Sequence, residues 1–85
     1  MKPSVGNKAD ISVLSLNSGN YGFVDAANHP FYLKTVQGTG TNNLVNGVNN
    51  NGQTDGVVNW KPTAAGTYYY QCSSHNGMYG TITVN

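Results

Sequence analysis

The chain is poor in charged side chains, and it contains no arginine and no glutamate. Charged residues make up 8% of its 85 residues, whereas they make up about 25% of an average soluble domain. Four lysines against three acidic residues leave a formal net charge of +1. So few cations form no basic surface that could follow a phosphate backbone. The composition therefore argues against nucleic-acid binding.

Long apolar runs and strong helix formers are scarce as well. No run approaches the roughly 20 residues that a membrane span needs. Residues 1–7 hold a lysine with no hydrophobic region behind it, so we expect no signal peptide, and Met1 is either a native start or follows a removed leader. The 11 glycines are scattered, and β-branched residues and tyrosines dominate the apolar set, as strands prefer. The length fits one small domain, residues 1–85, and the composition predicts an all-β fold.

Short segments rich in β-branched, aliphatic and aromatic residues alternate with Gly, Asn and Pro turn signals. They predict strands at residues 11–16, 21–24, 31–36, 57–60, 67–72 and 81–84. Residues 17–19 are typical of a hairpin turn, and Pro30 fits only the start or edge of a strand. Residues 1–10 predict either a loose lead-in or a short edge strand. About six to eight short strands with no helix signal indicate a Greek-key β-sandwich.

Alternation along the predicted strands assigns side chains to faces. In residues 67–72 it puts Tyr68, Tyr70 and Cys72 on one face and Tyr69 with Gln71 on the other. In residues 81–84 the two aliphatic residues are expected to point inward and both threonines outward; the inward pair is Ile82 and Val84.

Residues 37–56 form a Gly/Asn/Thr-rich tract that lacks regular periodicity. A structureless segment of this length is unusual in so small a domain. We expect an ordered wrapping loop with one short strand or turn, pinned to the body by Leu44, Val45 and Val48. The alternative is a flexible low-complexity insert.

The single cysteine, one of two histidines and the one methionine besides Met1 lie within seven residues, as C-x-x-H-x-x-M: Cys72, His75 and Met78. A lone cysteine is more often a buried small hydrophobe than a ligand, but these neighbours reverse that interpretation. Thiolate, imidazole and thioether together favour a soft, redox-active metal, copper above all.

His29 also follows a turn at the start of a predicted strand. If the strands at residues 31–36 and 67–72 lie side by side with the relevant ends together, His29 completes a set with Cys72, His75 and Met78. Two histidines and a cysteine in a plane, with a long axial methionine, are the ligands of a blue-copper electron-transfer centre. Zinc is the chemical competitor, but structural zinc sites rarely take a thioether.

In these residues the chain resembles the cupredoxins, the blue-copper family that includes plastocyanin, amicyanin and azurin. Its C-terminal copper loop and following strand are similar to Y-x-Y-x-C-x-x-H-x-x-M-x-G-x-I-x-V, matched by Tyr68, Tyr70, Cys72, His75, Met78, Gly80, Ile82 and Val84. The C-x-x-H-x-x-M spacing is most similar to that of amicyanin. Residues 28–35 resemble small cupredoxin-like domains of marine bacteria and their phages, and the resemblance covers about residues 11–85.

The resemblance implies one copper ion, with Cys72 as the thiolate ligand, His29 and His75 in the plane and Met78 axial. It also implies a monomer in a periplasmic or otherwise extracytoplasmic compartment and protein redox partners. The partner surface and the groups that support the ligands would come from residues around the site: Asn28, Pro30, Phe31, Gly77, Met78 and Tyr79.

Two positions depart from the family pattern. Pro30 stands where many cupredoxins have an asparagine that ties the two ligand loops together, so the resemblance leaves the source of this support open; Asn28 is one candidate. Ser73 and Ser74 replace the usual proline between the cysteine and the histidine.

We expect a type 1 copper protein that passes single electrons between redox partners. The alternative is a copper-binding or interaction module of a larger surface or virion protein, with no shuttle role. Enzymatic oxidase or reductase activity would need further copper sites and spare histidines, and the chain has two histidines in all. We therefore expect no enzyme.

Overall fold

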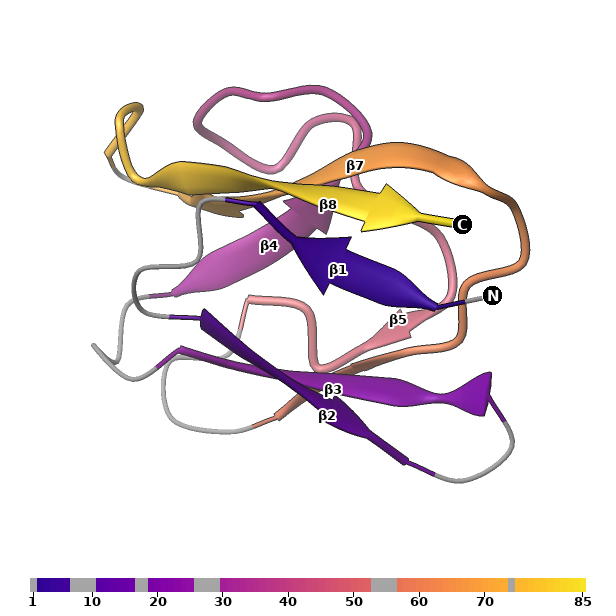
Figure 1. Cartoon of the computed structure of the whole chain (residues 1–85). Helices are drawn as coiled ribbons and strands as arrows, with labels where there is room; N and C mark the ends of the chain where they lie inside the picture. Colours follow the sequence, from indigo (N-terminus) through magenta and orange to yellow (C-terminus); the bar gives the residue numbers. More distant parts are fainter. Residues whose placement is uncertain (1, 7–10, 17–18, 26–29, 53–56, 74) are drawn as a thin grey trace.

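The computed structural model describes residues 2–6, 11–16, 19–25, 30–52, 57–73 and 75–85. They form two antiparallel four-stranded sheets that face each other as a β-sandwich (Figure 1). The first sheet has the order β1 (Pro3–Val5), β8 (Tyr79–Val84), β7 (Gly66–Cys72), β4 (Phe31–Lys34). The second has the order β2 (Ile11–Ser15), β3 (Tyr21–Asp25), β6 (Val58–Trp60), β5 (Val48–Asn49).

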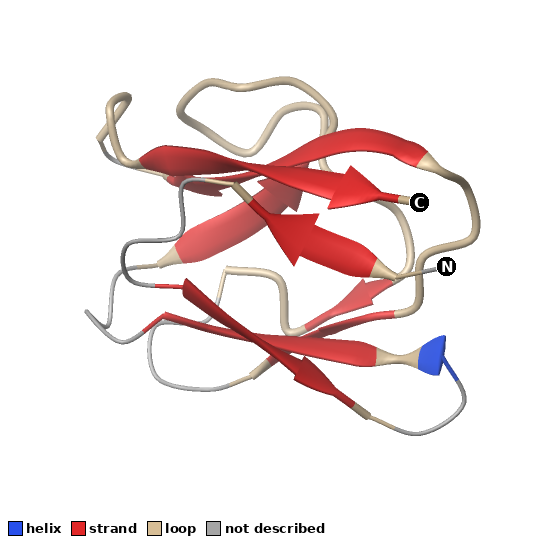
Figure 2. Ribbon diagram, in the orientation of Figure 1, coloured by secondary structure: helices blue, strands red, loops and turns tan. Residues whose placement is uncertain are grey.

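The all-β prediction is confirmed, because strands dominate both layers and the one helical turn drawn in Figure 2 is at Gly19. Between the described strands the chain crosses from sheet to sheet after β1, β3, β4 and β6, the kind of connection that Greek-key sandwiches use. Among the described residues there is no helix of the length and apolarity that a membrane crossing requires.

At the N-terminus, the edge-strand alternative is the correct one for residues 3–5. This strand, β1, pairs antiparallel with β8, with Pro3 opposite Val84. Residues 7–10 of the predicted lead-in lie outside the described residues. The predicted strand at residues 31–36 was too long: β4 ends at Lys34, because the Thr35 N–H donates to the carbonyl of Asn43 as the chain turns away.

The core lies between the sheets and draws on both. Its most deeply buried apolar side chains are each at most 1% exposed: Phe23, Phe31, Leu33, Val58 and Ile82. Trp60 of β6 meets the ring of Tyr68 of β7 edge-on, with 4.9 Å between centroids, a geometry that aromatic pairs prefer. Ile82 and Val84 are buried, so the inward alternation of this strand is confirmed.

The outer face of the first sheet is covered by the β4–β5 loop, residues 35–47. Figure 1 shows this loop on the side of β7 and β8 that faces away from the second sheet. Beneath it Lys34 is 2% exposed and Gln71 is 0% exposed, although both point away from the core. The Lys34 ammonium donates to three loop carbonyls, those of Gly38 (2.6 Å), Gly40 (3.2 Å) and Thr39 (3.3 Å).

The predicted wrapping loop is therefore confirmed over residues 37–52, and its short strand is β5. Val45 and Val48 pack against the core as expected. Leu44 contributes through its backbone, which bridges to Lys34, while its side chain is exposed. The free edge of β4 is further covered by the side-chain amide of Asn51, which accepts from the Leu33 N–H at 2.8 Å.

Candidate metal centre

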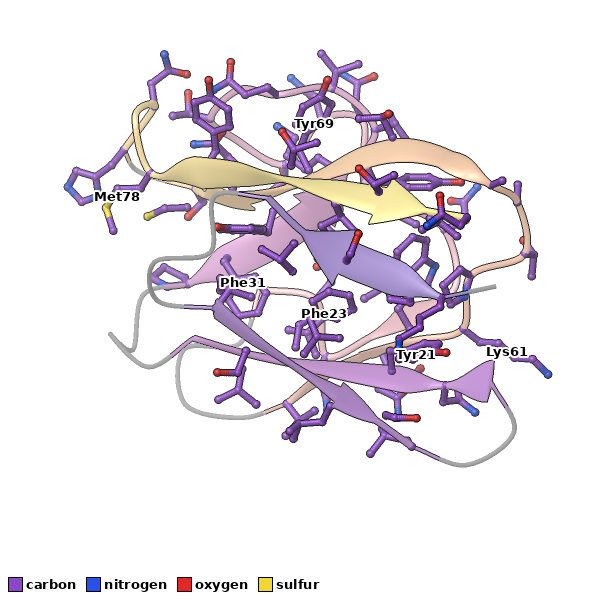
Figure 3. The ribbon with its side chains drawn as sticks, viewed as in Figure 1. Tyr21, Phe23, Phe31, Lys61, Tyr69 and Met78 are labelled. Atoms are coloured by element: carbon purple, nitrogen blue, oxygen red, sulfur yellow. The ribbon has the colours of Figure 1, made fainter. Side chains whose placement is uncertain are left out.

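The loop between β7 and β8 brings the C-x-x-H-x-x-M residues to one end of the sandwich. The Cys72 N–H donates to the carbonyl of Met78 at 2.9 Å, and the Met78 N–H donates to the carbonyl of His75 at 3.0 Å. These two bonds close the loop on itself. Met78 lies where the loop returns to the sheet, at the left in Figure 3. We call this the loop end of the molecule.

Within the loop, the thiol of Cys72 faces the imidazole of His75. The Sγ atom lies 3.5 Å from His75 Nδ1. Cys72 is 3% exposed and forms no disulfide, whereas His75 is exposed. A buried sulfur thus meets one nitrogen of a ring that solvent reaches.

This separation fits two donors that share one ion. Bond lengths of about 2.3 Å to sulfur and about 2.0 Å to nitrogen, the values known for zinc sites, place the two atoms about 3.5 Å apart at an angle of about 110°. The same distance also suits a thiol–imidazole hydrogen bond in the metal-free state. The separation is thus compatible with a shared ion that takes soft sulfur and imidazole ligands and with a hydrogen bond between the two side chains.

The start of β4 lies beside this loop. Phe31 is opposite Cys72 in the antiparallel β4–β7 pair, and the Ser73 N–H donates to the carbonyl of Pro30 at 3.3 Å. These two strands therefore lie side by side with the relevant ends together, which is the condition under which His29 would complete the proposed ligand set. His29 and Asn28 lie outside the described residues, so their roles as ligand and support remain predictions.

The residues suggested for a partner surface have different surroundings. Tyr79 and Gly77 are exposed, and Met78 and Pro30 are partly buried. Phe31 is 1% exposed and belongs to the core. Of the suggested residues that the structure describes, Phe31 therefore offers almost no side-chain surface to a partner, whereas the others are at least partly exposed.

Sequence reasoning missed the importance of Gln71. The alternation of β7 puts its side chain on the outer face, which predicts exposure, yet it is fully buried and hydrogen-bonded to the loop. The only signal in the sequence is an amide directly before the candidate cysteine ligand.

Among the described residues, no three histidine, cysteine, aspartate or glutamate side chains gather as a metal-binding group. Cys72 and His75 are the one cysteine and the one histidine in that part of the chain, and Met78 is a ligand of a different type. Scans of this chain against protein-family models, curated proteins and solved structures gave no match.

Proposed function

We propose that this protein is a type 1 copper protein of the cupredoxin kind, which transfers single electrons between redox partners. The observation that carries the proposal is the 3.5 Å approach of Cys72 Sγ to His75 Nδ1 on a loop that also holds Met78. Cys72, His75 and Met78 would hold the metal together with His29. When bound, copper supplies a one-electron couple between Cu(I) and Cu(II).

The surroundings of the loop suit this role. Cys72 is buried against β4, which excludes water from its sulfur. The backbone bonds between Cys72 and Met78 and between Met78 and His75 restrict how far the ligands can move. A loop held in this way changes little between two charge states of a bound metal, and this favours rapid electron transfer.

His75 is exposed, which supports electron transfer over a copper-binding module that has no redox partner. An exposed imidazole gives a partner protein direct contact with a ligand. The accompanying proposals are a monomer, an extracytoplasmic location and a docking surface around Pro30, Met78 and Tyr79. Electron self-exchange separates the two functions, since the shuttle predicts fast exchange and the module very slow exchange.

Titration of the metal-free protein with Cu(II) tests the proposal. We expect one equivalent to produce an intense visible thiolate-to-copper band. Cys72→Ser should abolish the band and leave the metal-free protein folded, because serine nearly preserves the volume of the buried side chain. A wild-type protein with only weak d–d absorption would contradict the copper function.

A further inference from the structure

Gln71 is a fully buried polar side chain on the face of β7 that points away from the core. Its Nε2 atom donates to the carbonyls of His75 (2.9 Å), Cys72 (3.0 Å) and Asn76 (3.3 Å). One side chain therefore binds the backbone of both Cys72 and His75, the two residues whose side chains meet at 3.5 Å.

The other end of the same amide is anchored to the β4–β5 loop. Gln71 Oε1 accepts from Gln37 Nε2 at 3.0 Å and from the Gly38 N–H at 3.2 Å. Gln37 Nε2 also reaches the carbonyl of Asn76 at 3.0 Å, and the Gly40 N–H donates to the carbonyl of Ser73 at 3.2 Å. The β4–β5 loop thus supports, from outside, the loop between β7 and β8. We call the latter the ligand loop because it carries the proposed ligands.

The start of β4 offers less support. Pro30 has no side-chain donor or acceptor, and it contacts the β7–β8 loop through its carbonyl, which accepts from the Ser73 N–H. Within the described part of the chain, Gln71 and Gln37 supply polar side-chain contacts to the β7–β8 loop. Groups of this kind orient metal ligands, and losing them usually costs about 10- to 100-fold in metal affinity.

We propose that Gln71 is the positioning residue of this site. It holds the backbone of Cys72 and His75 so that Sγ and Nδ1 are at ligating distance before a metal arrives. This inference rests on the proposed copper function and adds to it the group that fixes the ligand separation. Gln71 would not touch the metal; it acts through the two carbonyls.

The test compares Gln71→Leu with Val58→Ala. Val58 is 0% exposed in β6 of the second sheet, so its truncation lowers global stability without touching the loop. The first readout is amide hydrogen exchange of Cys72 and Met78 in the metal-free protein. The second is Cu(II) affinity by chelator competition, with the visible spectrum of the copper form.

We expect Gln71→Leu to speed exchange of these two amides at least tenfold relative to β3 amides, to lower copper affinity about 10- to 100-fold, and to alter the charge-transfer band. Val58→Ala should have no selective effect on the exchange rates of the loop amides, and it should leave the charge-transfer band unchanged. If Gln71→Leu does not fold, Gln37→Leu decides, because it removes donors to Gln71 and Asn76 from a partly exposed position. It should shift all three measurements in the same direction.

The inference would be overturned if the Gln71 or Gln37 variant kept the copper affinity, the visible band and the loop exchange rates of the wild-type protein. Equal effects of Val58→Ala on these quantities would overturn it as well. The wild-type band separates this result from failure of the copper function. If the wild-type protein shows the band and the variants match it, only the role of Gln71 is wrong. If the wild-type protein shows no band, both are wrong.

Discussion

Lys34 is the residue whose burial most needs a physical account. The residue is 2% exposed, and its ammonium donates to the carbonyls of Gly38, Thr39 and Gly40. A buried charge is costly unless hydrogen bonds replace its hydration, and these carbonyls supply them. In return the lysine fixes the loop segment that supports Gln71.

Lys34→Met keeps most of the apolar stem and removes the three donors. We expect a loss of about 1–3 kcal/mol in the free energy of unfolding, because loop carbonyls lose their partners; removal of a buried charge offsets part of this cost. Urea denaturation measures it. Lys61→Met is the control, since Lys61 is exposed, and equal stability of the two variants would contradict the role of Lys34.

Single residues show where sequence reasoning reaches its limit. Cys72, His75 and Met78 could be grouped from spacing because one short loop carries all three. Alternation also gave the correct faces of β7. It could not reveal that Lys34 and Gln71 are buried, because their cover comes from a loop whose sequence has no periodicity.

At the level of elements, β4 is an edge strand whose exposed side has been closed. The Asn51 side chain accepts from the Leu33 N–H through Oδ1, and its Nδ2 atom donates to the Leu33 carbonyl at 3.4 Å. The Val45 N–H donates to that same carbonyl at 3.0 Å, and the Gly52 N–H donates to the Phe31 carbonyl at 2.9 Å. Loop groups thus take the place of a neighbouring strand, which protects the edge from pairing with another chain.

Asn51→Ala should destabilise the protein by about 1–3 kcal/mol, because the partly buried Leu33 N–H loses its acceptor. It should also raise the tendency to aggregate at high concentration. Chemical denaturation and light scattering measure the two effects. Asn42→Ala in the β4–β5 loop, at an exposed position, should change neither quantity; similar values for both variants would argue against a specific role of Asn51.

The positions of strands and turns along the chain were largely predictable from the sequence, whereas the contacts that these elements make with one another were less so. Asn51 and Gly52 form an Asn-Gly pair, which favours tight turns, and they lie in a turn. Gly52 has a φ of 94°, which favours glycine, and a Cβ on it would lie 2.6 Å from the ring of Tyr32, so any other residue would also force that ring to move. The docking of Asn51 on β4 depends on how a long loop folds back, which local propensity does not specify.

For the whole molecule, copper should act as a stabilising ligand. With free copper at 100 times its dissociation constant, binding adds about 2.7 kcal/mol, which raises Tm by about 10–20 °C in a domain of this size. Thermal unfolding with Cu(II) and after chelation measures this shift. Cys72→Ser should show a much smaller shift, and an unchanged wild-type Tm in the presence of the visible band would contradict the prediction.

The fold class was predictable at this scale because composition and alternation are properties of the entire chain. The strand order was not, since β1 joins β8 and β4 joins β7 across long sequence separations. The proposed ligand set suggested one such pair, namely the strand that begins at residue 31 and the strand that ends at residue 72. These two strands, β4 and β7, are paired in the structure.

The two ends of the described chain meet far from the loop end. The Asn85 N–H lies 3.4 Å from the carbonyl of Lys2, and the termini appear together at the right of Figure 1. The six residues of β8 separate them from the ligand loop by about 20 Å. A carrier, anchor or electrode attached through either terminus would therefore sit at the end of the sandwich opposite the loop that carries the exposed His75.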